Sequence, residues 1–413
     1  MSTSRPRRRL DELEGLRGIA ALVVVFSHLR HTFFENASQA IRFRYGDTAE
    51  TLFKACIDGT CAVWIFWVMS AFVLSLKFHA SSPGDHLNTM LRDATFKRYP
   101  RLMLPILASV CLAWALHAGD LMTNQDLAEI LGPEYDAWLG SFYTFAPSPS
   151  HAFQSAVWHA LFDYRAEDSY NAVLWTMEIE FYGSLFLFAF LALFGKHALR
   201  LFVYALTLAV VSALGAHWIS SFILGTALCD VYVHRQMLTE RFSPRIRLFT
   251  AAARNSKLLA IAVLATLWYA IGLPNRWGVM NLILATFVTG FVVFSSPASR
   301  FFALSPFVFL GKISFGLYLV HLAIICSAAY PLFNAFHPVV GRHQAAIAAS
   351  LCLLALSIAG GWCLWFVADR PAVSLARAVS DTFERPLRDN QKTAEVAHQP
   401  DANRVTATDV SRQ

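Results

Sequence analysis

Four long uncharged segments constrain the fold of this chain more than any other feature of its sequence. No Asp, Glu, Lys or Arg occurs in residues 201–229, 277–299, 313–341 or 344–368. Each segment is longer than the roughly 20 apolar residues that a helix needs to cross the hydrocarbon core of a bilayer. Because an isolated helix satisfies all its backbone hydrogen bonds in lipid, these segments predict an all-α fold, a polytopic membrane helical bundle.

The composition agrees with an integral membrane protein. Charged residues make up 15% of the 413 residues and hydrophobic residues 56%, whereas a soluble domain carries about 25% charged residues. The net charge of +6 is read as a marker of orientation, because cytoplasmic loops are enriched in Lys and Arg. No patch interleaves basic and aromatic residues, so we expect the lipid bilayer, and no nucleic acid, among the partners.

Apolar periodicity predicts about ten transmembrane helices. The uncharged run 201–229 is divided in two, because basic clusters flank both ends and the positive-inside rule then requires two crossings. The predicted helices cover residues 14–35, 59–78, 100–118, 173–195, 200–216, 218–234, 257–273, 277–295, 307–330 and 345–368.

The same rule predicts the topology and the domains. Residues 1–13 form a basic cytoplasmic N-terminus, and residues 14–371 form the transmembrane domain. The acidic segment 119–172 is expected on the opposite side of the membrane. Residues 372–413 are polar and predict a disordered cytoplasmic tail. We therefore expect a multi-pass protein of the plasma or inner membrane with both termini in the cytoplasm.

Ionisable residues inside apolar helices mark the first candidate site. His28 lies eleven residues after Arg17, which is about 16 Å along a helix and half of a bilayer core. Glu178, Glu180 and His321 lie at similar depth in other predicted helices. Such residues are costly to insert and are usually functional. A histidine with a carboxylate is the pairing that general base catalysis uses; the alternative is a set of buried polar groups that only join helices.

A basic cluster at the start of the third predicted span marks the second candidate site. Lys97, Arg98 and Arg101 lie close together around Tyr99-Pro100. Guanidinium groups suit phosphate oxygens, so the cluster predicts a phosphate-binding clamp that faces the cytoplasm. The alternative is a positive anchor at the membrane surface.

Two further patterns in the sequence are weaker indications of function. His151, His159 and Asp163 match no standard metal-ligand spacing, so we expect no metal. Gly311, Gly316, Gly360 and Gly361 are predicted to allow close helix packing and not to take part in chemistry.

Six motifs in order resemble the acyltransferase-3 family of integral membrane O-acyltransferases. Together they span most of residues 10–371. They are Leu13 to His28 with its Arg17-to-His28 spacing, Phe66 to Ser75 around Ser70, Arg98-Tyr99-Pro100-Arg101, Leu174 to Tyr182 with Glu180, Gly311 to His321 with Tyr318, and Asp369-Arg370-Pro371. Ala71 stands where the family usually has Gly, and Glu178 stands where Ser or Pro is commoner.

The resemblance implies ten spans and transfer of an acyl group, commonly acetyl, from cytoplasmic acyl-CoA. The acceptor is expected to be a hydroxyl of a carbohydrate, a lipid-linked glycan or a secreted metabolite. His28 would act as general base, Glu180 would orient it, and His321 would hydrogen-bond the reacting carbonyl or the acceptor. Arg98 and Arg101, with Arg92 and Lys97, would bind the CoA phosphates, and Arg17 would support the cytoplasmic mouth. Glu178, Ser70 and Tyr318 would have supporting roles.

A different function remains open from the residues themselves. His28 and Glu180 could form the proton relay of a proton-coupled small-molecule transporter. Transporters often contain internal repeats, and this sequence shows none, so the acyltransferase is the preferred prediction. No pattern specifies the acceptor, the acyl chain, a separate partner protein or the oligomeric state.

Overall fold

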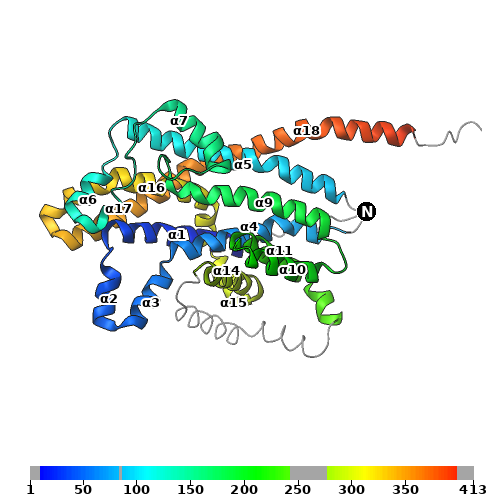
Figure 1. Ribbon diagram of the computed structural model, residues 1–413, viewed down its shortest axis with the longest axis horizontal. Coiled ribbons are helices and arrows are strands. Elements are labelled where there is room, and N and C mark those ends of the chain that lie inside the picture. The colour runs from blue at the N-terminus through cyan, green and yellow to red at the C-terminus, as the bar shows by residue number, and fades with distance from the viewer. Residues whose placement is uncertain (1–9, 83–85, 242–276, 398–413) are drawn as a thin grey trace, which may run out of the picture.

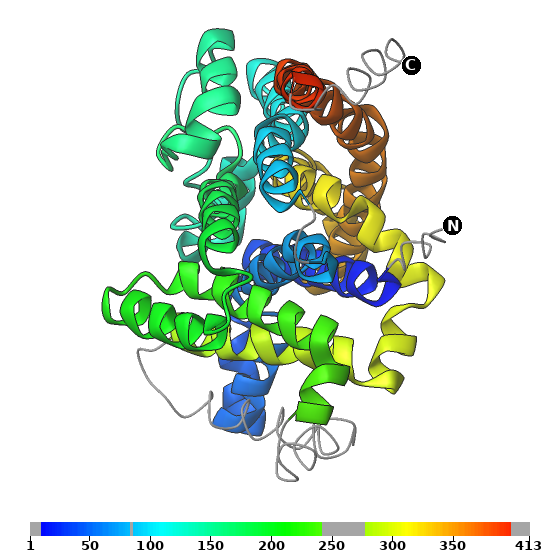
Figure 2. The same cartoon turned by 90° about the vertical axis from the view of Figure 1, so that its right-hand side faces the viewer.

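The computed structural model describes residues 10–82, 86–241 and 277–397, and this part of the chain folds as helices joined by turns and loops. Figure 1 shows α1 (Asp11–Phe33), α5 (Leu87–Ala118), α9 (Trp175–Phe194) and α16 (Ser305–Val340) lying along the long axis of the molecule. Figure 2 looks along that axis and shows the helices gathered into one bundle. The predicted all-α class is confirmed for the described residues.

The remaining elements surround these long helices. They are α2 (Ala37–Tyr45), α3 (Asp47–Cys56), α4 (Gly59–Ala80), α6 (Asn124–Leu131), η1 (Pro133–Tyr135), α7 (Pro149–Gln154), η2 (Ser155–His159), α8 (Ala160–Phe162), η3 (Ala172–Leu174), α10 (Arg200–Ala213), α11 (His217–Arg241), α14 (Trp277–Phe294), α15 (Ser296–Phe302), α17 (Arg342–Leu364), η4 (Trp365–Asp369) and α18 (Arg370–Ala397).

The described residues contain fewer clear spans than the sequence predicts. Five helices are long and apolar enough to cross a membrane, or six if α14 and α15, bent by 95°, count as one broken span. Nine of the ten predicted segments are helical in the structure, and the tenth, residues 257–273, lies outside the described residues. The count of ten is therefore not confirmed. Ionisable side chains lower the apolarity of α1 and α11, and α10 has only 14 residues.

The helices α5 and α18 differ most from the sequence prediction. The helix α5 begins at Leu87 and not at residue 100, and it carries Pro100 and Pro105 inside it. Residues 372–397, expected to be disordered, belong to the helix α18. A π-helical turn, η4, joins α17 to α18, so the chain continues as helix beyond the last apolar span. Ser380 on α18 donates a hydrogen bond to Asp93 on α5, a tertiary contact that composition alone does not indicate.

Glycines permit close helix crossings in the bundle. A Cβ atom added to Gly18 on α1 would lie 2.6 Å from the backbone nitrogen of Gly311 on α16, and one added to Gly311 would lie 1.9 Å from the carbonyl oxygen of Glu14. The pair Gly316 and Gly361 makes a similar contact between α16 and α17, at 2.4 Å. The predicted packing role of Gly311, Gly316 and Gly361 is confirmed. The contacts at Gly18 and Gly311 place the backbones of α1 and α16 directly against each other.

The segment between α5 and α9 folds as a cap over one end of the bundle. Asn124 donates to the carbonyl oxygens of Leu139 and Phe142, at 2.7 and 3.1 Å. Thr123 binds α16 through its backbone nitrogen, at 2.9 Å from the carbonyl oxygen of Cys326. The Asn124 bonds hold the cap together internally, and the Thr123 bond fixes it against α16, next to the candidate site.

Candidate active site

Two histidines from distant parts of the chain meet inside the bundle. His28 Nδ1 on α1 lies 2.6 Å from His321 Nε2 on α16. The two rings are nearly parallel, 9° apart, with centroids separated by 4.9 Å. A nitrogen–nitrogen distance this short is a hydrogen bond and not a face-to-face ring contact, so the rings meet edge to edge. The predicted co-location of His28 and His321 is observed.

The surrounding contacts assign the protons of this pair. His321 Nδ1 lies 3.2 Å from the carbonyl oxygen of Leu317, which can only accept, so Nδ1 carries a proton. In the neutral ring Nε2 is then an acceptor, and it must receive the proton of His28 Nδ1. The remaining nitrogen of His28, Nε2, is left with its lone pair free. Among the described residues, none makes a hydrogen bond to His28 Nε2. His321 is fully buried.

His31 lies on the same face of α1 as His28, but both of its ring nitrogens have hydrogen-bond partners. His31 Nδ1 lies 2.7 Å from Glu35 Oε2, and His31 Nε2 lies 2.5 Å from Arg30 Nη2. Because a guanidinium can only donate, Nε2 of His31 must accept, and both its nitrogens are engaged. His31 is therefore held as a neutral ring, and His28 is the histidine of α1 with a free lone pair.

The cap covers both of these histidines with one aromatic ring. Trp138 lies 5.5 Å from the His28 ring and 5.3 Å from the His31 ring, centroid to centroid. Phe142 packs edge-on against Trp138 at 5.2 Å. Sequence reasoning missed Trp138, because it lies in a loop whose fold over α1 is a tertiary contact.

The carboxylate expected beside His28 lies elsewhere. Glu180 on α9 forms an ion pair with Arg98 on α5 and accepts a hydrogen bond from Ser70 on α4. Arg98 Nε also donates to Ser184 Oγ at 2.8 Å. The side chains of Glu180 and Arg98 are each only 12% exposed. The structure thus pairs Glu180 with Arg98 and not with either histidine, since α4, α5 and α9 turn these polar faces toward one another.

The other basic candidates line the end of the bundle at which α5 begins. Arg101 pairs with Asp369 at η4, and its side chain remains 32% exposed. Lys97 Nζ lies 2.6 Å from Asp93 Oδ2. Arg17 lies 3.7 Å from Glu14 on the same helix, and Arg92 is partly buried on α5.

The two supporting candidates on α9 and α16 have separate roles in the structure. Glu178 Oε2 accepts from the backbone nitrogen of Tyr164 at 3.3 Å. Tyr318 shares a hydrogen bond with Thr176, at 2.9 Å, and donates to the carbonyl oxygen of Val173, at 3.0 Å. Its ring lies 6.0 Å from that of His321. Tyr318 therefore ties the segment before α9 to the turn of α16 that bears His321.

A further tether at this turn comes from Asn171. Its Nδ2 donates to the carbonyl oxygen of Leu319 at 2.7 Å, and its side chain is almost fully buried. An Asn in a polar loop gives no sequence signal of such a contact, so sequence reasoning missed it too.

The weak metal candidates do not converge. His151 pairs with Asp168 at 3.1 Å, and His159 lies 3.5 Å from Asp163. Within the described ranges, no three His, Cys, Asp or Glu side chains are grouped as a metal site requires.

Comparison with known proteins assigns the described bundle to a family. Residues 10–366 match the family described as an acyltransferase domain. The chain therefore belongs to the acyltransferase-3 family, as the six motifs predict. It is also similar to the O-acetyltransferase PaAT-1 of Phomopsis amygdali, with 25% identity over 389 residues that cover 82% of this chain and 77% of the relative. No solved structure is a significant match.

Proposed function

We propose that this protein transfers an acyl group, acetyl in the simplest case, from cytoplasmic acyl-CoA to a hydroxyl of a glycan or another envelope or secreted acceptor. The observation that carries the proposal is the free Nε2 of His28, which the bond to His321 leaves as a base. Membership of an acyltransferase family and the similarity to an O-acetyltransferase support this reaction class.

In the proposed reaction, His28 Nε2 removes the proton of the acceptor hydroxyl. The oxygen then attacks the thioester carbonyl carbon, the carbon–sulfur bond breaks, and an ester forms. The proton passes from His28 to the departing sulfur, so CoA leaves as a thiol. His28 is transiently an imidazolium, and His321 Nε2 accepts its Nδ1 proton throughout. His321 therefore takes the orienting role that sequence reasoning assigned to Glu180.

The revised partners also change the proposal for the basic cluster. Arg98 directs its donors to Glu180, Ser70 and Ser184, so we assign it to holding α4, α5 and α9 in register. Arg101 keeps an exposed part of its side chain, and with Lys97 and Arg92 it is the better candidate for contacts to CoA phosphates. Arg17 lies on α1, eleven residues before His28, and in this proposal supports the cytoplasmic entrance for acyl-CoA.

The test is a turnover assay on purified protein in lipid nanodiscs. With acetyl-CoA and a hydroxyl acceptor, release of the CoA thiol should be detected for the wild type. It should fall by about 10²- to 10⁴-fold in His28→Gln, which keeps a hydrogen bond but cannot take the proton. Thiol release by folded His28→Gln at the wild-type rate would remove His28 from the role of base. Proton-coupled uptake without any thiol release would favour the transporter.

A further inference from the structure

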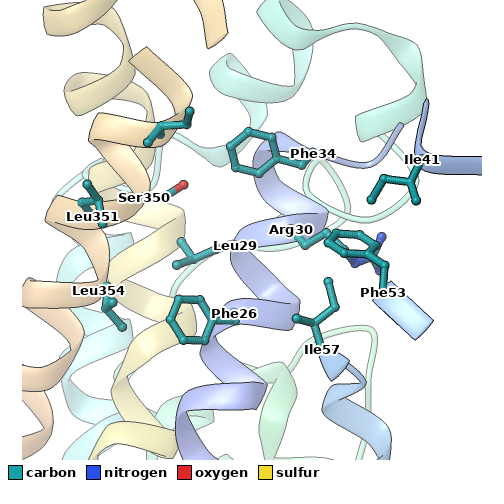
Figure 3. A pocket seen from close by; sticks show the side chains of 11 residues that line it. Phe26, Leu29, Arg30, Phe34, Ile41, Phe53, Ile57, Ser350, Leu351 and Leu354 are labelled. Atoms are coloured by element: carbon teal, nitrogen blue, oxygen red, sulfur yellow. The ribbon is translucent and has the colours of Figure 1, made fainter. Parts of the chain in front are cut away.

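A pocket opens on the outer side of α1, away from the face that carries His28. Its volume is about 410 Å³, within the range of small-molecule sites. Figure 3 shows side chains from α1, from the α2–α3 hairpin and from α17 pointing into it. They include Phe26, Leu29 and Phe34 on the α1 side, Phe53 on α3, and Leu351 on α17.

The pocket is suited to hydrocarbon and not to water. Its polar lining residues are Arg30 and Ser350, and both already have partners: Arg30 contacts His31 and Glu35, and Ser350 donates to the carbonyl oxygen of Ala346 at 2.8 Å. A buried water needs two to four polar partners, so the pocket offers it too few. Apolar cavities of this kind bind apolar molecules.

The exposed side chains around the pocket lead us to expect that it faces the membrane, next to an interfacial element. Leu351 and Ile347 on α17 are 63% and 53% exposed, as expected for side chains that contact lipid. The α2–α3 hairpin, which forms one wall of the pocket, exposes charged and aromatic side chains, among them Arg42, Arg44 and Tyr45. Such side chains are typical of the headgroup region of a membrane. A molecule in this pocket would therefore hold its tail in hydrocarbon and its head at the membrane surface.

A chain of contacts connects the pocket to the proposed base. Arg30 in the pocket wall binds His31, His31 packs on Trp138, and Trp138 packs on His28. Three contacts thus separate Arg30 in the pocket wall from His28, which places the pocket next to the last turn of α1.

We propose that this pocket binds the hydrocarbon tail of an amphiphilic acceptor, which enters sideways from the membrane and presents its hydroxyl beside Trp138 to His28. This inference rests on the proposed acyltransferase function and specifies its acceptor as a lipid-like molecule. The pocket adds a binding subsite on a face of α1 that the catalytic histidines do not occupy.

The experiment compares two acceptors with the same head, methyl glucoside and dodecyl glucoside, in nanodiscs with labelled acetyl-CoA. Leu351→Trp fills the pocket and should raise the ratio of the KM for dodecyl glucoside to that for methyl glucoside by about tenfold or more. Leu356→Trp is the matched control, because Leu356 is an exposed leucine of α17 outside the pocket, and its ratio should equal that of the wild type. An equal ratio in all three proteins would overturn the inference.

A direct label makes the result independent of the acceptor head. Dodecyl glucoside with a photoreactive diazirine in its chain should label residues 41–57 and 342–364, and Leu351→Trp should reduce this labelling at least about fivefold while Leu356→Trp does not. Uniform labelling of the lipid-facing surface would overturn the proposed subsite. Absence of acetyl-CoA turnover by the wild type, with site-specific labelling retained, would instead count against the proposed function.

Discussion

Gly18 and Gly311 face each other where α1 crosses α16, so closely that a Cβ atom on Gly18 would lie 2.6 Å from the backbone nitrogen of Gly311. His28 and His321 lie farther along the same two helices, ten residues beyond each glycine. The crossing therefore sets the distance between the two imidazoles.

Gly18→Ala should lower the stability of the protein and increase the distance between His28 and His321. The added methyl group meets backbone atoms that cannot move aside, which costs about 1–3 kcal/mol of stability. We expect a lower thermal midpoint in detergent and a larger loss of kcat than of acetyl-CoA affinity. Gly290→Ala is the control, since its Cβ would meet only Leu228, at an ordinary 3.5 Å. Equal behaviour of the two variants would show that the crossing tolerates a methyl group.

Replacement of His321 should impair the base without removing it. His321→Leu leaves His28 Nδ1 without an acceptor, so the tautomer with a free Nε2 is no longer selected. We expect kcat to fall by roughly 10²-fold or more, with the KM for acetyl-CoA unchanged. His321→Gln offers a carbonyl oxygen to the same proton and should recover part of the loss. A His321→Leu enzyme with wild-type kcat would refute the orienting role.

Arg98 and Glu180 should behave as one unit. Glu180→Gln or Arg98→Met alone leaves the other charge buried and unpaired, which typically costs about 3–5 kcal/mol. The double variant removes both charges and should be more stable than either single variant, as measured by thermal unfolding in detergent. Strictly additive losses would show that the two residues act independently, as a direct phosphate contact from Arg98 would require.

Arg101→Ala should weaken acyl-CoA binding by roughly 10- to 150-fold, the value of about 1.5–3 kcal/mol for a charge-assisted hydrogen bond. Arg101→Lys should recover only part of the affinity, because a single ammonium lacks the planar fork. Isothermal titration with CoA and with dephospho-CoA would identify the phosphate involved. Arg165→Ala, an exposed residue of the cap paired with Asp163, serves as the control. Unchanged affinity of Arg101→Ala for CoA would show that the basic cluster serves only as an anchor at the membrane surface.

The topology can be tested with single cysteines in a cysteine-free background. The helix α5 has 32 residues, about 48 Å, so His86 and the cap lie at opposite ends of it. An impermeant thiol reagent added outside intact cells should label Arg165→Cys and not His86→Cys. Labelling of His86→Cys from outside would invert the predicted orientation.

Local sequence patterns were enough to predict the class of fold and to single out the two histidines of the candidate site. Long uncharged runs predict helices because lipid offers no partner to an open backbone, and nine of the predicted segments are helical. His28 and His321 stand out because an ionisable side chain in such a run is costly. Both signals are local and need no knowledge of packing.

Which polar groups meet could be seen only in the folded chain. Glu180 pairs with Arg98 because of how α4, α5 and α9 are rotated, and His28 finds His321 because glycines let α1 and α16 touch. The cap brings Trp138 over α1 from more than 100 residues away. Helix rotation, crossing distance and loop docking arise from side-chain packing between segments, and a single sequence does not encode these in any local pattern.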